Sequence, residues 1–138
     1  MASGARGVVE DMITRGWNAG DMEVVERCYA RNCVSYAITS GLAERTGADA
    51  QKAWVTRTRE AFPDLHMTIE SIHVSRDRAV TRWRATGTQR GEWLGLPPTS
   101  RKATWGGITI HRFMANRIQE EWVSTDIAHA LQELGYVA

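Results

Sequence analysis

The chain has 138 residues and a formal net charge of +1, with 43% hydrophobic and 24% charged residues. This length predicts one domain over residues 1–138, large enough to bury roughly two-thirds of its unfolded surface. The basic residues are scattered, and there is neither a signal-peptide pattern nor a long apolar run. We therefore expect a cytoplasmic protein that binds neither nucleic acid nor a membrane.

The first half of the chain predicts three helices and one short strand. The helices are expected over residues 8–17, 21–29 and 46–62, and the strand over residues 33–37. Asp21 is expected to cap the second helix, and Pro63 stops the third. A loop that contains Gly41 separates the strand from the third helix. Cys28 and Cys33 show no metal-ligand spacing and are interpreted as two buried thiols.

After Pro63 the hydrophobic period changes to two, which is typical of strands. Four strands and a terminal helix are expected over residues 65–72, 79–89, 102–113, 117–125 and 126–134. A tight turn at Ala115-Asn116 joins the last two strands into a hairpin. This order predicts an α+β fold: a cone-shaped α+β barrel with a curved, mostly antiparallel sheet wrapped around helices and an internal apolar cavity.

Several motifs along the chain together resemble the SnoaL-like family, which shares the cone fold of nuclear transport factor and ketosteroid isomerase. In chain order they are Trp17-Asn-Ala-Gly-Asp21, Ala61-Phe-Pro-Asp-Leu-His66, Thr86-Gly-Thr-Gln-Arg-Gly91, Gly95-Leu-Pro-Pro-Thr99, Arg117-Ile-Gln-Glu-Glu-Trp122, Asp126 and Leu134-Gly135. The resemblance implies a polyketide cyclase that closes a ring by intramolecular aldol condensation without a cofactor. In such enzymes a carboxylate on the last strand moves the proton, and a Gln and a His on the preceding strand hold the enolate.

Aligned on the hairpin turn, these three family positions fall at Gly107 for the Gln, Thr109 for the His and Val123 for the carboxylate. None of the three side chains performs the aldol step, so we expect a bare apolar wall and no standard cyclase chemistry. A carboxylate and an amide side by side at the bottom of the cavity would contradict this expectation and favour ring closure.

The resemblance extends to anthracycline ring hydroxylases, which share the fold and also lack the cyclase constellation. These enzymes work without metal or flavin, beside a short-chain reductase that supplies a reduced quinone substrate. The first prediction is therefore cofactor-independent ring hydroxylation of an aromatic polyketide, together with a reductase partner. An aldol-type cyclase that uses other groups is the alternative. A non-catalytic cone that binds an apolar ligand is the third hypothesis.

Three residues are candidates for proton transfer. His111 shares the face of Thr109 by alternation, so it is expected to reach the cavity as a proton carrier or as a wall residue. Glu121 shares the face of Val123 and is either the acid or a solvated hairpin residue. Asp126 is either a general acid at the cavity mouth or the N-cap of the last helix.

The candidates for substrate contact are aromatic or polar side chains on the strands, together with Val123. They are Tyr36, Arg82, Trp83, Trp105, Thr109 and Val123. Six tryptophans in a chain of this length suggest a cavity for a planar ligand, provided that several of them surround it. No histidine shows metal-ligand spacing, and no metal is expected.

The outer face of the predicted hairpin is also apolar. Ile108, Ile110 and Trp122 lie opposite the face of Thr109 and Val123. Because a sheet that is apolar on both faces needs cover on both, we predict a homodimer through the sheet.

Overall fold

The computed structural model describes residues 4–38 and 42–137. The helices are α1 (Gly4–Asp11), the π-helical η1 (Met12–Trp17), α2 (Met22–Cys28), α3 (Ala48–Ala61) and α4 (Ile127–Glu133). The strands are β1 (Tyr29–Ala37), β2 (Arg45–Thr46), β3 (His66–Ser75), β4 (Arg78–Thr88), β5 (Lys102–Met114) and β6 (Arg117–Thr125). The expected elements are confirmed with small shifts in their ends, but β2 was not predicted. The loop predicted around Gly41 lies partly outside the described residues.

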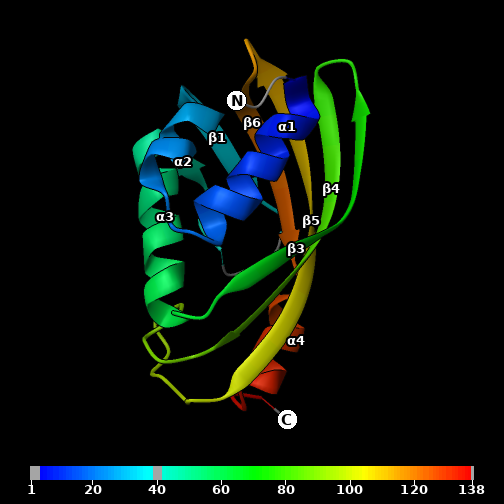
Figure 1. Cartoon of the computed structure of the whole chain (residues 1–138). Coiled ribbons are helices and arrows are strands. Elements are labelled where there is room, and N and C mark those ends of the chain that lie inside the picture. The colour runs from blue at the N-terminus through cyan, green and yellow to red at the C-terminus, as the bar shows by residue number, and fades with distance from the viewer. Residues whose placement is uncertain (1–3, 39–41, 138) are drawn as a thin grey trace.

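The described strands form one mixed sheet with the order β2-β1-β6-β5-β4-β3. All neighbouring strands are antiparallel except β1 and β6, which run parallel. The sheet curves around the helices and stays open between its edge strands β2 and β3 (Figure 1). This arrangement confirms the predicted α+β cone fold.

The helices occupy two places on the sheet. α1, η1, α2 and α3 cover its concave face, whereas α4 packs against β5 near the start of that strand (Figure 1). Side chains from both layers form the core, and Val25, Val55 and Ile118 are fully buried. Each such side chain contributes about 1.5–3 kcal/mol to folding by leaving water.

Local signals in the first helices agree with the sequence prediction. The Asp21 carboxylate accepts hydrogen bonds from the backbone N–H groups of Glu23 and Val24, so Asp21 caps α2 as expected. The helix predicted over residues 8–17 is α1 continued by η1, where the Asn18 N–H donates to the Ile13 carbonyl at 3.0 Å. The interpretation of the two cysteines is confirmed, since both are free and buried.

The hairpin of β5 and β6 turns at Ala115 and Asn116, as predicted. Both residues have positive φ, 52° and 59°, which is the geometry of a two-residue type I′ turn. The resulting register pairs Thr109 with Val123 and His111 with Glu121. These four side chains therefore share the inner face of the sheet.

None of the described helices is long and apolar enough to cross a membrane.

Candidate active site

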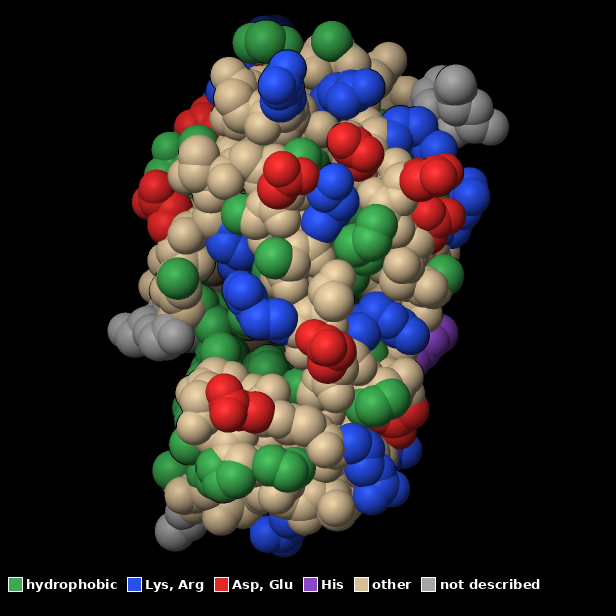
Figure 2. All heavy atoms as spheres, turned by 90° about the vertical axis from the view of Figure 1, so that its left-hand side faces the viewer, with side chains coloured by type: hydrophobic (Ala, Val, Ile, Leu, Met, Phe, Trp, Pro, Cys, Tyr) green, Lys and Arg blue, Asp and Glu red, His purple; other side chains and the backbone are tan. Residues whose placement is uncertain are grey.

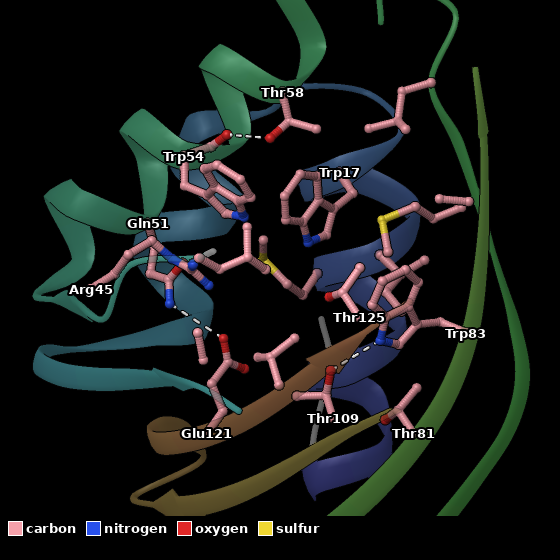
Figure 3. A pocket seen from close by; sticks show the side chains of 18 of the residues that line it. Trp17, Arg45, Gln51, Trp54, Thr58, Thr81, Trp83, Thr109, Glu121 and Thr125 are labelled. Atoms are coloured by element: carbon pink, nitrogen blue, oxygen red, sulfur yellow. Dashed lines mark hydrogen bonds between the residues drawn. The ribbon is translucent and has the colours of Figure 1, made fainter. Parts of the chain in front are cut away.

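An elongated cavity lies between α3, η1 and the inner face of the sheet (Figure 3). Five of the six tryptophans line it: Trp17, Trp54, Trp83, Trp93 and Trp105. Several tryptophans thus surround one cavity, as a site for a planar ligand requires. The cavity adjoins a groove that Arg45, Trp54, Arg57 and Trp93 help to line. Figure 2 shows hydrophobic side chains in a recess beside basic ones on this side of the molecule.

A buried carboxylate–imidazole pair lies at one end of the cavity. Glu121 is 4% exposed and His111 is 7% exposed, and both line the cavity. His111 Nδ1 lies 3.1 Å from Glu121 Oε2. The two residues are opposite each other on β6 and β5, so the strand register itself brings them together.

Glu121 is surrounded by three further donors, two from β1 and one from α3. Its Oε1 accepts hydrogen bonds from the Tyr29 hydroxyl at 2.8 Å, the Ser35 hydroxyl at 3.0 Å and the Gln51 side-chain amide at 3.2 Å. Figure 3 shows Gln51 of α3 pointing towards Glu121 of β6. A buried carboxylate costs much free energy unless it is paired in this way, so the cluster is a built site.

The pKa values within the cluster keep its groups in complementary states. Burial on its own would raise the pKa of the Glu121 carboxyl, but its contacts with His111, Arg45 and Tyr29 hold it below the usual value. Burial and the neighbouring Glu121 raise the pKa of the Tyr29 phenol well above its usual value. Glu121 is therefore an anion that accepts, and Tyr29 a neutral phenol that donates.

Arg45 completes the cluster as its cation. Its Nε donates to Gln51 Oε1 at 2.9 Å, and its Nη2 donates to Ser35 Oγ at 3.0 Å. The guanidinium lies over the Trp54 ring, 5.1 Å from the ring centroid. Arg45 thus fixes two of the residues that donate to Glu121, Ser35 and Gln51, and offsets part of the charge of Glu121.

The hydrogen bonds of His111 indicate which of its two ring nitrogens carries the proton. Because Glu121 is ionised, Nδ1 of His111 carries the proton of their shared bond. His111 Nε2 lies 3.1 Å from the Thr81 hydroxyl, which serves it as donor or acceptor. Glu121 therefore holds Nδ1 and orients the ring, and Nε2 is the nitrogen of His111 that Glu121 does not occupy.

The middle of the cavity wall is formed by a tryptophan that packs across a glycine. Trp83 of β4 pairs with Gly107 of β5, where a Cβ would lie 2.3 Å from Trp83 Cζ2. The Trp83 indole N–H donates to Thr109 Oγ1 at 3.0 Å. Gly107 is thus required for the close approach of the indole, and the Thr109 hydroxyl keeps its own proton for another acceptor.

The expectation of a bare wall is wrong. Gly107, Thr109 and Val123 do lack the aldol groups, but a carboxylate and an amide lie side by side at Glu121, two residues before Val123 on β6, and at Gln51 of α3. The solvated alternative for Glu121 does not hold because its side chain is buried. Tyr29, Ser35, Arg45 and Gln51 were not predicted as site residues. A signal existed for Gln51 alone, which shares the helical face of the buried Val55 and Thr58.

Three predicted site residues lie outside the cavity lining, and for Asp126 this confirms the N-cap alternative. Asp126 is exposed and accepts the His129 N–H at 3.1 Å, so it is the N-cap of α4. Arg82 points away from the cavity and pairs with Glu70 at 3.2 Å. Tyr36 stacks on Trp122 on the outer face of the sheet, with ring centroids 5.7 Å apart. Arg82 and Tyr36 lie on the outer face of the sheet, and Asp126 lies outside the cavity at the end of β6. None of the three is placed to contact a substrate in the cavity.

The other candidates do line the cavity: His111 and Glu121, together with Trp83, Trp105, Thr109 and Val123. Their contact with a substrate stays a prediction. Over residues 4–38 and 42–137, no group of three His, Cys, Asp or Glu side chains is placed to hold a metal ion.

Solved structures similar to this chain come from several bacteria. AclR from Streptomyces galilaeus, a candidate hydroxylase, is 26% identical over 96% of this chain and 82% of its own, with a TM-score of 0.82. IdmH from Streptomyces antibioticus, a candidate polyketide cyclase, is 24% identical over 96% of this chain and 99% of its own, with a TM-score of 0.83. A SnoaL-like candidate polyketide cyclase from Jannaschia sp. CCS1 is 22% identical over 97% and 93%, with a TM-score of 0.86.

A comparison with curated proteins found no match. The family described as SnoaL-like polyketide cyclase matches residues 7–134, which is nearly the whole chain. With the cone fold and the cavity described above, this match shows that the chain belongs to the SnoaL-like polyketide cyclase family.

Proposed function

We propose that this protein closes a ring of an aromatic polyketide by a cofactor-independent intramolecular aldol reaction, with His111 as the base. The observation that carries the proposal is the buried Glu121–His111 pair beside the Gln51 amide, at one end of a tryptophan-lined cavity. Residues 1–138 act as one domain in this proposal. The free thiols of Cys28 and Cys33 suit a reducing cytoplasm.

The reaction needs a group that removes a proton from carbon and later returns it. His111 Nε2 takes a proton from a carbon between two carbonyl groups, and the C–H electron pair becomes an enolate. The enolate carbon attacks a ketone carbon of the same molecule, so a C–C bond forms and the C=O π bond breaks. The resulting alkoxide receives the proton back from His111. A positioned acid–base group of this kind contributes about 10²–10⁴-fold to the rate.

Glu121 and Thr109 support these steps in different ways. Glu121 is anionic and bonded to Nδ1, so it stabilises the imidazolium that forms when Nε2 takes the proton. Thr109 lines the cavity on the same strand face as His111, and its hydroxyl proton is free for the enolate oxygen because the oxygen accepts from Trp83. Thr109 thus replaces the family His as a neutral donor.

A second candidate function is cofactor-independent ring hydroxylation, which the 26% identity with AclR favours. A reductase partner would supply the substrate as a hydroquinone. His111 would remove a hydroquinone proton, and the electron-rich ring would transfer two electrons to dioxygen and bind it as a hydroperoxide. Loss of the proton from the same ring carbon would then supply two more electrons, break the O–O bond, leave one oxygen atom on the ring and release the other as water. Here too the chemistry starts from proton removal, so both candidates use the same pair.

A mass and oxygen measurement tests the proposal. Under anaerobic conditions the protein should convert an open-chain anthraquinone methyl ester into a ring-closed product without a change in mass. Hydroxylation would be supported instead if the protein acted only on a reduced anthraquinone, took up oxygen and added one oxygen atom to the product. Binding of both compounds with neither reaction would contradict both and leave a non-catalytic binding protein.

We also propose a homodimer through the outer face of the sheet. Val80, Ile110, Trp122 and Tyr36 stand opposite one another on four adjacent strands and form an apolar row. Val80 is 38% exposed and Ile110 is 37% exposed. A second copy of this face would cover the row by two-fold symmetry.

A further inference from the structure

One buried polar group in the cavity is not explained by the proton-transfer pair. Trp93 is 4% exposed, and its indole Nε1 has no hydrogen-bond partner among the described residues. Leaving a buried donor unpaired costs roughly 1–3 kcal/mol. Because native proteins pair most buried polar groups, this N–H points to an acceptor outside the described residues.

The surroundings of Trp93 supply no acceptor of their own. Its ring packs edge-on against Phe62 at a centroid distance of 5.2 Å, and lies 5.4 Å from the ring of Trp105. Trp93 lines both the cavity and the adjoining groove. A molecule that fills the cavity at this aromatic end would therefore lie against the Trp93 side chain.

The loop that carries Trp93 holds the ring in place before any ligand binds. Trp93 and Leu96 exchange backbone hydrogen bonds of 3.0 and 2.9 Å across a turn that has positive φ at Leu94 and Gly95. The buried Gln89 side chain donates to the carbonyls of Gly91 and Pro97, both at 3.2 Å. The Trp93 ring is therefore already ordered in the folded protein, so a ligand does not pay the entropic cost of ordering it.

Trp93 lies far from the proton-transfer pair. Its neighbour Trp105 and His111 both point inward from β5 and are six residues apart, which corresponds to roughly 20 Å of strand. A ligand that reaches both ends must be elongated and must present an acceptor remote from its reacting carbon.

We propose that Trp93 Nε1 donates a hydrogen bond to a neutral carbonyl oxygen, a ketone or a quinone, of the bound polyketide. This contact fixes which end of the planar molecule lies away from His111. The inference rests on the proposed function for the class of ligand. An indole N–H is a neutral donor, and the Phe62 and Trp105 rings around it offer no counter-ion for a carboxylate. Arg45 and Arg57 of the groove are the competing site for a carboxylate.

The direct test follows the NMR chemical shift of the Trp93 indole N–H in the wild-type protein. Trp93 is assigned by the peak that disappears from the ¹H–¹⁵N spectrum of Trp93→Phe. On addition of 9,10-anthraquinone this peak should move downfield, whereas anthracene, the same tricycle without carbonyls, should leave it near its free position. Equal shifts with both compounds, a shift with 9-anthracenecarboxylate only, or no downfield shift at the highest soluble anthraquinone concentration would overturn the proposal.

A single-atom replacement provides the affinity measurement. 3-Benzothienylalanine at position 93 keeps the bicyclic shape and replaces the N–H by sulfur, and it should raise the Kd for anthraquinone about 5- to 10-fold while the Kd for anthracene stays unchanged. The same replacement at Trp122, on the outer face, should leave both constants unchanged. Equal weakening of both ligands at position 93 would mean lost packing and would contradict the proposal.

His111→Gln separates this inference from the proposed function. The substitution removes the proposed base and leaves the aromatic end intact, so the Trp93 shift with anthraquinone should persist in it. A persistent shift together with no ring closure by the wild type would mean that the proposed reaction fails while the carbonyl contact holds. Ring closure by the wild type without the shift would mean the reverse.

Discussion

In the middle of the β5–β6 hairpin, the two faces carry the reverse of the usual distribution of residues. The inner face holds the buried Thr109, His111 and Glu121, with Glu121 only 4% exposed. The outer face presents Ile108 and Ile110 to solvent, and Ile108 is 48% exposed. A buried polar face is tolerated only when its groups are paired, and an exposed apolar face only when something covers it. The paired polar groups of the inner face indicate a reaction site, and the exposed apolar residues of the outer face indicate an interface.

The largest effect is expected for Glu121→Ala, compared with the same change at its neighbour Glu120 on the opposite face. Glu121→Ala leaves the Tyr29, Ser35, Gln51 and His111 donors without their acceptor and should lower the free energy of unfolding by about 3–5 kcal/mol. Glu120→Ala removes an outer ion pair with Arg112 and should cost less than about 1 kcal/mol. Urea unfolding followed by circular dichroism measures both. Similar losses for the two variants would break the distinction between the faces.

The outer face is tested by Ile110→Asp. In a two-fold interface the new carboxylates of the two copies would approach each other, which costs several kcal/mol and should give monomers on sizing chromatography. Ala53→Asp, an exposed change on α3 and away from the outer face of the sheet, serves as the control for added charge. A dimer that persists in Ile110→Asp, or a wild type that elutes as a monomer, would contradict the proposed interface.

Adjacent glycines sharpen the comparison at the cavity wall. In Gly107→Ala the added methyl group would lie 2.3 Å from Trp83 Cζ2 and 2.6 Å from the Ser124 carbonyl oxygen, so the indole must move. We expect a loss of about 1–3 kcal/mol by overpacking. In Gly106→Ala the nearest atom is 3.3 Å away, and the loss should be smaller. Thermal unfolding of both variants checks this order, and a larger loss for Gly106→Ala would contradict it.

The smallest effect is expected in the pH dependence of stability. The pKa of Glu121 is lowered in the folded protein, so its ionised form stabilises the fold above the usual carboxyl pKa. This contribution disappears as the pH falls through the lowered value. The free energy of unfolding should therefore fall more steeply between pH 6 and pH 3 in the wild type than in Glu121→Gln. Parallel curves would show that Glu121 does not titrate as described.

Local features of the fold could be predicted from the sequence because they depend on near neighbours. The Asp21 cap, the Ala115-Asn116 turn and the alternation that places His111 on the inner face each follow from residues a few positions apart. The last two strands and the last helix were located for the same reason. The short β2 was missed because its two residues form a strand only through pairing with β1.

The site could be predicted only in part, because its cluster is assembled by distant contacts. Glu121 follows Gln119 and Glu120, a run that is typical of a solvated strand. Its burial depends on the parallel pairing of β1 with β6, which brings Ser35 opposite Glu121, and on the position of α3, which supplies Gln51. Neither contact leaves a periodic signal in the sequence. Tyr36 was placed on the wrong face and the face of Arg82 could not be decided, because alternation does not reveal which face points inward.

The central claim is that His111 removes a proton from carbon inside the cavity, and deuterium exchange tests it most directly. The methylene protons of a naphthyl β-keto ester in D₂O should exchange faster with wild-type protein than in buffer alone, as followed by NMR. His111→Gln should lower the protein-dependent rate about 10²–10⁴-fold without loss of binding, whereas His66→Gln, at an exposed position on β3, should keep the wild-type rate. Exchange at the wild-type rate in His111→Gln would contradict the account.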